Sequence, residues 1–134
     1  MLEEWILKKK EVEDSKAYLR GVDLCNAKLM AAKLSGADLA KADLTSAYLI
    51  KADLSNANLS GTDLTQAVLS EANLSGADLD GAELMDSFLH GANLKGVVNL
   101  TCDQLELANF DKDTIFPDYI TIHWTKNGCC ECQE

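Results

Sequence analysis

Cysteine and histidine are the side chains in this sequence best suited to covalent or metal chemistry. The chain contains Cys25, Cys102, Cys129, Cys130 and Cys132, together with His90 and His123. An odd number of cysteines without a secretory signal argues against a disulfide framework, and the run from Cys129 to Cys132 lacks the CxxC spacing of a zinc site. We therefore expect a flexible tail with reduced thiols. Metal capture or redox cross-linking by this tail, with His123 taking part, stays open as the alternative.

Catalytic motifs are missing from the sequence. Neither histidine has a nucleophile at a recognisable spacing, and no GxSxG, P-loop or GxGxxG motif occurs. The sequence therefore predicts a protein that is not an enzyme, with no catalytic residue, no cofactor and no metal.

Charge and hydropathy exclude further classes of function. Twenty-two acidic residues oppose twelve basic ones in 134 residues, for a net charge of −10. Such a charge opposes direct binding to nucleic-acid phosphates. No apolar run approaches the roughly 18 residues of a membrane span, and the N-terminus lacks the basic and apolar regions of a signal peptide. We expect a cytoplasmic protein that binds neither nucleic acid nor membrane.

The dominant feature of the sequence is leucine at every fifth position, sixteen times from Leu19 to Leu94. A small residue, usually alanine, stands two positions before each leucine. On an α-helix five residues advance about 500°, so these leucines would not share one stripe. On a continuous strand, odd spacing would place alternate leucines on opposite faces. A short extended segment followed by a turn places both residues inward, so each pentapeptide is predicted to be one side of a coil.

Outward positions repeat every twenty residues, which favours four pentapeptides per coil and four coils in all. The position before leucine carries one apolar column, Tyr48, Val68 and Phe88. It also carries the acidic stripe, Asp23, Asp43, Asp63 and Glu83. Seven of the eight glycines lie two residues after a leucine, so we expect the corners of the coil there. The predicted fold is an all-β solenoid.

These two columns are the candidate sites. Asp, Asn and Glu before leucine are expected mainly to bond backbone amides at turns, although the acidic stripe could also attract a cationic partner or a metal ion. The predicted contact surface, called the apolar face here, consists of Tyr48, Ile50, Val68, Phe88 and His90. Stacked apolar neighbours that only stabilise adjacent coils are the alternative. A terminal helix or residues 119–124 could also fold over this face.

Runs such as ADLTSAYLIKADLSNANLSG resemble the A(D/N)Lxx pattern of the pentapeptide-repeat family over residues 17–96. The resemblance implies a right-handed quadrilateral parallel β-helix; the handedness comes from the family and not from the spacing. The stretch TCDQLELANFDKDTIFP resembles the tail that often follows the repeats in cyanobacterial members.

The ends of the stack need covers, because exposed rungs invite association. We predict a single domain over residues 1–134, with a helical cap over 1–16 and the repeats over 17–96. A second cap and an extended segment follow over 97–124, with a helix at 102–109 that starts at a capping box, Thr101 to Gln104. The flexible cysteine tail is placed at 125–134.

Two functions follow. The first is a non-enzymatic interaction or scaffold module that presents flat faces to an unidentified protein partner or forms a weak homodimer. The second is implied by the resemblance, because a few family members imitate DNA and act on DNA gyrase. Residues 17–96 hold ten acids and six bases, so the repeats carry only −4 of the net charge. The sequence favours the interaction module.

Overall fold

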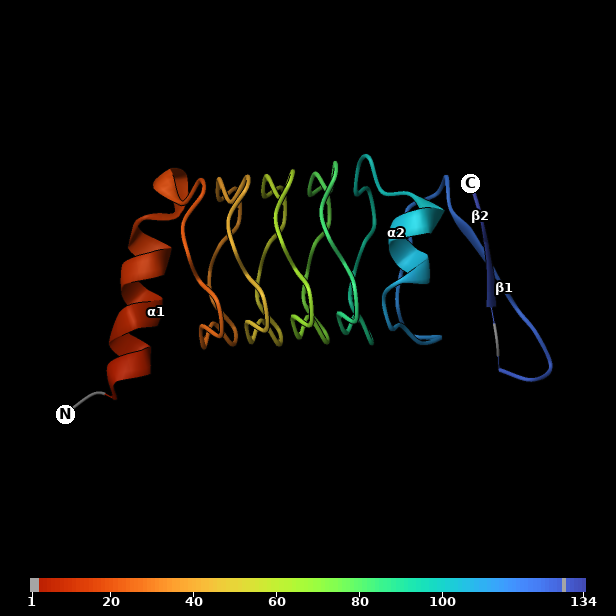
Figure 1. The fold of residues 1–134 in the computed structure, drawn as a ribbon, viewed down its shortest axis with the longest axis horizontal. Coiled ribbons are helices and arrows are strands. Elements are labelled where there is room, and N and C mark those ends of the chain that lie inside the picture. The colour runs from red at the N-terminus through yellow and green to blue at the C-terminus, as the bar shows by residue number, and fades with distance from the viewer. Residues whose placement is uncertain (1–2, 129) are drawn as a thin grey trace.

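Parallel backbone pairing between residues twenty positions apart builds most of the molecule. The computed structural model describes residues 3–128 and 130–134. Parallel bridges join Asp23 to Asp43, Asp43 to Asp63, and Asp63 to Glu83, and the same step recurs on the other sides of the coil. The coils stack along the long axis of Figure 1. The backbone thus adopts the twenty-residue period predicted from the sequence.

Each corner is a tight turn between a leucine and the next small residue. After Leu24, the N–H of Ala27 donates to the Leu24 carbonyl at 3.1 Å, and Asn26 between them has a φ of 62°. A positive φ at the third turn residue is typical of a type II turn, where glycine is favoured. The glycines predicted at the corners all adopt it. Turns follow one another so closely that each side forms an isolated bridge and not an extended strand, which differs from the expected all-β pattern.

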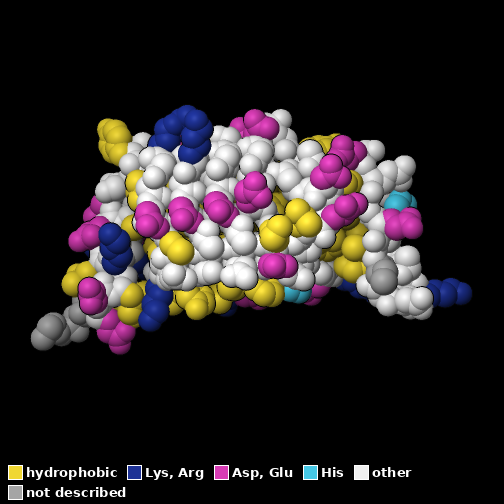
Figure 2. Space-filling view, viewed as in Figure 1, with side chains coloured by type: hydrophobic (Ala, Val, Ile, Leu, Met, Phe, Trp, Pro, Cys, Tyr) yellow, Lys and Arg dark blue, Asp and Glu magenta, His cyan; other side chains and the backbone are white. Residues whose placement is uncertain are grey.

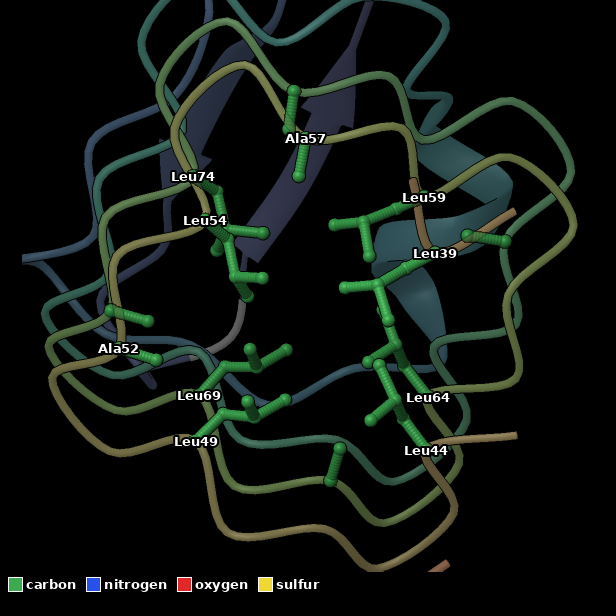
Figure 3. Close-up of a cluster of buried hydrophobic side chains, with 14 of the residues drawn as sticks. Leu39, Leu44, Leu49, Ala52, Leu54, Ala57, Leu59, Leu64, Leu69 and Leu74 are labelled. Atoms are coloured by element: carbon green, nitrogen blue, oxygen red, sulfur yellow. The ribbon is translucent and has the colours of Figure 1, made fainter. Parts of the chain in front are cut away.

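Leucine and alanine point into the coils and form one continuous core. Every repeat leucine from Leu19 to Leu94 is at most 4% exposed. Figure 3 shows these side chains meeting at the centre of successive coils. Thr62 and Ser87 replace alanine without leaving a polar group unpaired, because their hydroxyls donate to the carbonyls of Leu39 at 2.7 Å and Leu84 at 2.8 Å. The predicted inward positions are confirmed.

Helix α1 (Glu4–Asp14) and the 3-10 helix η1 (Lys16–Tyr18) cover the N-terminal end. Helix α1 is shorter than the predicted cap at 1–16, and Leu2, one of its predicted apolar residues, lies outside the described residues. Val12 is buried against the first coil. The Glu13 carboxylate accepts the Lys33 N–H at 2.7 Å and so takes the place of a preceding coil. None of the helices in the described part of the chain could cross a membrane, being too short or too polar.

Helix α2 (Cys102–Glu106) covers the C-terminal end and begins at the predicted capping box. It ends before the predicted residue 109, because Asn109 returns to the coil and bridges Phe88. Parallel pairing therefore continues past residue 96. The Gln104 side-chain amide donates to the carbonyls of Leu79 at 2.8 Å and Ala82 at 2.9 Å, so α2 satisfies backbone groups that the last coil leaves open.

The last segment corrects two predictions. Strand β1 (Thr121–Trp124) pairs antiparallel with β2 (Cys130–Gln133), so the tail predicted to be flexible at 125–134 contains a strand. A disulfide joins Cys102 to Cys132, so the prediction of reduced thiols is wrong for these two residues. Ile120 is buried and Ile122 packs on the core, which brings the hairpin beside α2. Cys129 lies outside the described residues.

Candidate interaction surface

The acidic stripe is part of the turn structure. The carboxylates of Asp23, Asp43 and Asp63 each accept the backbone N–H two residues later, at 2.9–3.0 Å. Hydrogen bonds from Thr45 lower the pKa of Asp43, because they stabilise its charged form. Figure 2 shows acidic side chains in a row along the coils. Asp23, Asp43 and Asp63 thus bond backbone amides at turns, as expected.

One exposed group on this stripe has the ligand types of a metal site. A carboxylate oxygen of Asp23, the Sγ of Cys25 and a carboxylate oxygen of Asp43 lie within 4.8 Å of one another. Desolvation and the carboxylates of Asp43, Asp23 and Asp63 raise the pKa of the Cys25 thiol. The thiolate is the form that binds metals and attacks electrophiles, and a raised pKa disfavours that form.

The apolar face is assembled as the sequence predicts. Parallel bridges join Tyr48 to Val68 and Val68 to Phe88. Backbone hydrogen bonds hold the neighbouring column in the same way. The carbonyls of Ile50 and His90 each accept a hydrogen bond from a backbone N–H of the preceding coil. Tyr48 is 44% exposed and Phe88 is 38% exposed, so neither is covered by a terminal element within residues 3–128 and 130–134. The rings of Phe88 and His90 stack with centroids 6.3 Å apart.

Two shallow hollows flank these side chains. One, of about 440 Å³, lies between Tyr48, Val68 and Phe88 and reaches Asn109. The other, of about 290 Å³, lies between Tyr48, Ile50 and Trp5 of α1. Lys9 of α1 donates to the carbonyl of Met30 at 3.2 Å, and Met30 lines the second hollow with Trp5, so α1 forms one wall of this hollow.

A partly exposed turn at residues 111–114 supports the C-terminal end of the apolar face. The Asp111 carboxylate accepts the backbone N–H groups of Gly91 at 3.0 Å, Thr114 at 3.1 Å and Asp113 at 3.0 Å. Desolvation acts to raise the pKa of Asp111, but these hydrogen bonds and the nearby His90 outweigh it and hold the pKa below 3.8.

This shift predicts acid sensitivity. A carboxyl whose pKa is depressed in the folded state stabilises the fold above its unfolded pKa, and that contribution is lost as the pH falls through the folded pKa. We expect Asp111→Asn to lower the melting temperature at pH 7, with the difference from wild type shrinking below about pH 4. Asp113→Asn is the control, because its carboxylate makes none of these bonds. A difference that stays constant with pH would contradict the assignment.

Sequence reasoning missed several residues beside these sites. Trp5 was assigned only to a cap, yet it lines a hollow with Tyr48. Phe110 and Trp124 meet at the C-terminal end with ring centroids 5.9 Å apart. Apolar residues alternate at Ile120, Ile122 and Trp124, which indicates an extended segment, but alternation alone does not reveal which element the Trp124 ring meets.

A family model described as pentapeptide repeats matches residues 15–45, 27–66 and 62–98. The chain belongs to the pentapeptide repeat family. Proteins of this family form right-handed quadrilateral β-helices, as the resemblance implied. No curated protein matched the sequence of this pentapeptide repeat protein.

Three solved structures are similar to this chain. A pentapeptide repeat protein from the Arabidopsis thaliana thylakoid lumen is 28% identical over 84% of this chain and 74% of its own, with a TM-score of 0.63. A pentapeptide repeat protein from the cyanobacterium Nostoc is 30% identical over 84% of this chain and 85% of its own, with a TM-score of 0.43. QnrB1, a plasmid-mediated fluoroquinolone resistance protein, is 18% identical over 69% of this chain and 49% of its own, with a TM-score of 0.54, which is a likeness of fold alone.

Proposed function

We propose that this pentapeptide repeat protein is a non-enzymatic interaction module of the cytoplasm and that the apolar face is its contact surface. The observation that carries the proposal is the exposure of Tyr48 and Phe88, 44% and 38%, on one line of the solenoid. Elsewhere the equivalent position before leucine mostly carries Asp or Asn bonded to its own turn.

The backbone holds this face rigid. Each residue of the column both donates to and accepts from neighbouring coils, as when the Val68 N–H donates to Ala47 at 2.9 Å and its carbonyl accepts from Leu49 at 2.8 Å. A preorganised face loses little conformational entropy on binding. The face covers roughly a few hundred Å², below the about 800 Å² per partner of a standard interface, so a homodimer through it alone is expected to be weak. A separate protein partner is the occupant we favour.

The test is the double variant Tyr48→Asp with Phe88→Asp. Charges on both aromatic positions are expected to abolish partner capture and self-association, while the melting temperature barely moves. Asn73→Asp with Asn93→Asp is the matched control, because it adds the same charge at the same repeat position on another side. Pull-down and sedimentation are compared across the three proteins. If only the melting temperature falls, the column is structural and the proposal is wrong.

The alternative is a DNA mimic directed at DNA gyrase. The acidic stripe and the fold shared with QnrB1 favour it. Four coils span only about 15–20 Å, whereas duplex DNA carries one phosphate charge per roughly 1.7 Å. We therefore expect no inhibition of gyrase supercoiling at about 1–5 μM protein, since the repeats carry too little charge to compete with DNA. Potent inhibition in that assay would reverse the order of the two functions.

A further inference from the structure

A cleft of about 630 Å³ lies at the C-terminal end of the molecule, where α2 and the hairpin of β1 and β2 come together. Figure 1 shows these elements side by side beyond the last coil. The cleft is lined by, among others, Glu106 of α2, Phe110, Trp124 of β1 and Glu131 of β2. The cleft falls within the 300–1,000 Å³ typical of ligand sites.

Aromatic rings form one wall of the cleft. Phe110 packs edge-on against Trp124 with centroids 5.9 Å apart, and against Phe116 with centroids 5.1 Å apart. These contacts hold the Trp124 ring in place although it is 36% exposed. An indole ring that is fixed in place and exposed to solvent can pack against an aliphatic chain and can attract a cation through its π electrons.

The charged side chains of the cleft favour a cation. Glu106 and Glu131 enter from different elements, and within the described ranges, 3–128 and 130–134, neither forms an ion pair. Among the described residues that line the cleft there is no lysine or arginine, and His90 is the basic side chain present. Residues 97–134 contain seven acidic and two basic residues, so the surroundings are also negative. Carboxylates beside an aromatic wall are complementary to a guanidinium or an ammonium group on an apolar stem.

Two links fix the geometry of the two carboxylates. The disulfide between Cys102 and Cys132 joins α2 to β2, with the Cα atoms 5.6 Å apart. The Glu134 carboxylate accepts the Cys102 N–H at 2.7 Å. The elements that carry Glu106 and Glu131 are therefore tied together, and the cleft is preorganised.

We propose that this cleft binds an arginine or lysine side chain presented by a basic segment of a partner protein. The stem of that side chain lies along Trp124 and Phe110, and its cation pairs with Glu106 and Glu131. The remaining volume accommodates the flanking backbone. His90 of the apolar face also lines this cleft, so the two surfaces adjoin, but Glu106, Phe110, Trp124 and Glu131 do not belong to that face.

Fluorescence anisotropy tests the proposal with the full chain at pH 7.5 and physiological salt. The probe is a fluorescein-labelled Gly-Ser peptide with three arginines, and the same peptide with glutamine at those positions is its control. The variant Glu106→Gln with Glu131→Gln keeps the shape of the cleft and is expected to weaken binding about tenfold or more. Trp124→Ala is expected to weaken it about fivefold or more.

Matched variants separate this site from general charge attraction. Glu4→Gln with Glu11→Gln removes the same charge from α1 at the opposite end and is expected to leave peptide affinity within about twofold. Tyr48→Asp alone, which changes the apolar face at a residue that does not line the cleft, is likewise expected to retain binding. Equal affinity for the glutamine peptide, no measurable arginine-peptide binding, or equal losses in the α1 variant and the cleft variant would overturn the proposal.

Discussion

Leu59→Ala is expected to lower the free energy of unfolding by about 2–5 kcal/mol. Leu59 is completely buried, and Figure 3 shows it pointing into the core among the leucines of neighbouring coils. Truncation removes apolar contacts and leaves a cavity, because the paired backbone on both sides of the coil prevents the site from collapsing. Urea denaturation followed by circular dichroism measures the change.

Asp63→Ala is the control for Leu59. Asp63 points outward, and its carboxylate accepts one backbone N–H, from Thr65 at 3.0 Å. Loss of one hydrogen bond at the surface costs about 0.5–1.5 kcal/mol. Comparable losses in the two variants would show that the assignment of inward and outward positions is wrong.

Removing the disulfide with Cys102→Ser and Cys132→Ser is expected to cost about 2–4 kcal/mol. The bond closes a loop between residues 30 positions apart, and opening it returns conformational freedom to the unfolded chain. The hairpin of β1 and β2 should loosen first, because that bond ties β2 to α2. Denaturant melts measure the stability, and amide hydrogen exchange locates the loosened segment.

Cys25→Ser is the control, because Cys25 is exposed on the repeats and lies outside the disulfide. A double variant as stable as this control, with unchanged exchange in β1 and β2, would contradict the prediction.

The sequence by itself determined the repeating part of this protein. Leucine and a small residue recur in every pentapeptide, so one local rule, applied many times, specifies the inward side chains, the corners and the columns. The column of Tyr48, Val68 and Phe88 could be predicted for the same reason: once twenty residues form a coil, any position twenty residues on must lie beside it. Regular pairing turns sequence spacing directly into spatial neighbours.

Only the tertiary structure decided what happens where the repeat ends. The link between Cys102 and Cys132 and the meeting of Phe110 with Trp124 join segments that share no period. The odd number of cysteines argued against a disulfide framework. An odd or even count, however, does not reveal which thiols the fold brings together. Likewise, whether α1 would cover Tyr48 depended on the angle at which that helix leaves the first coil. Contacts between non-repeating segments depend on three-dimensional packing, so sequence spacing does not encode them.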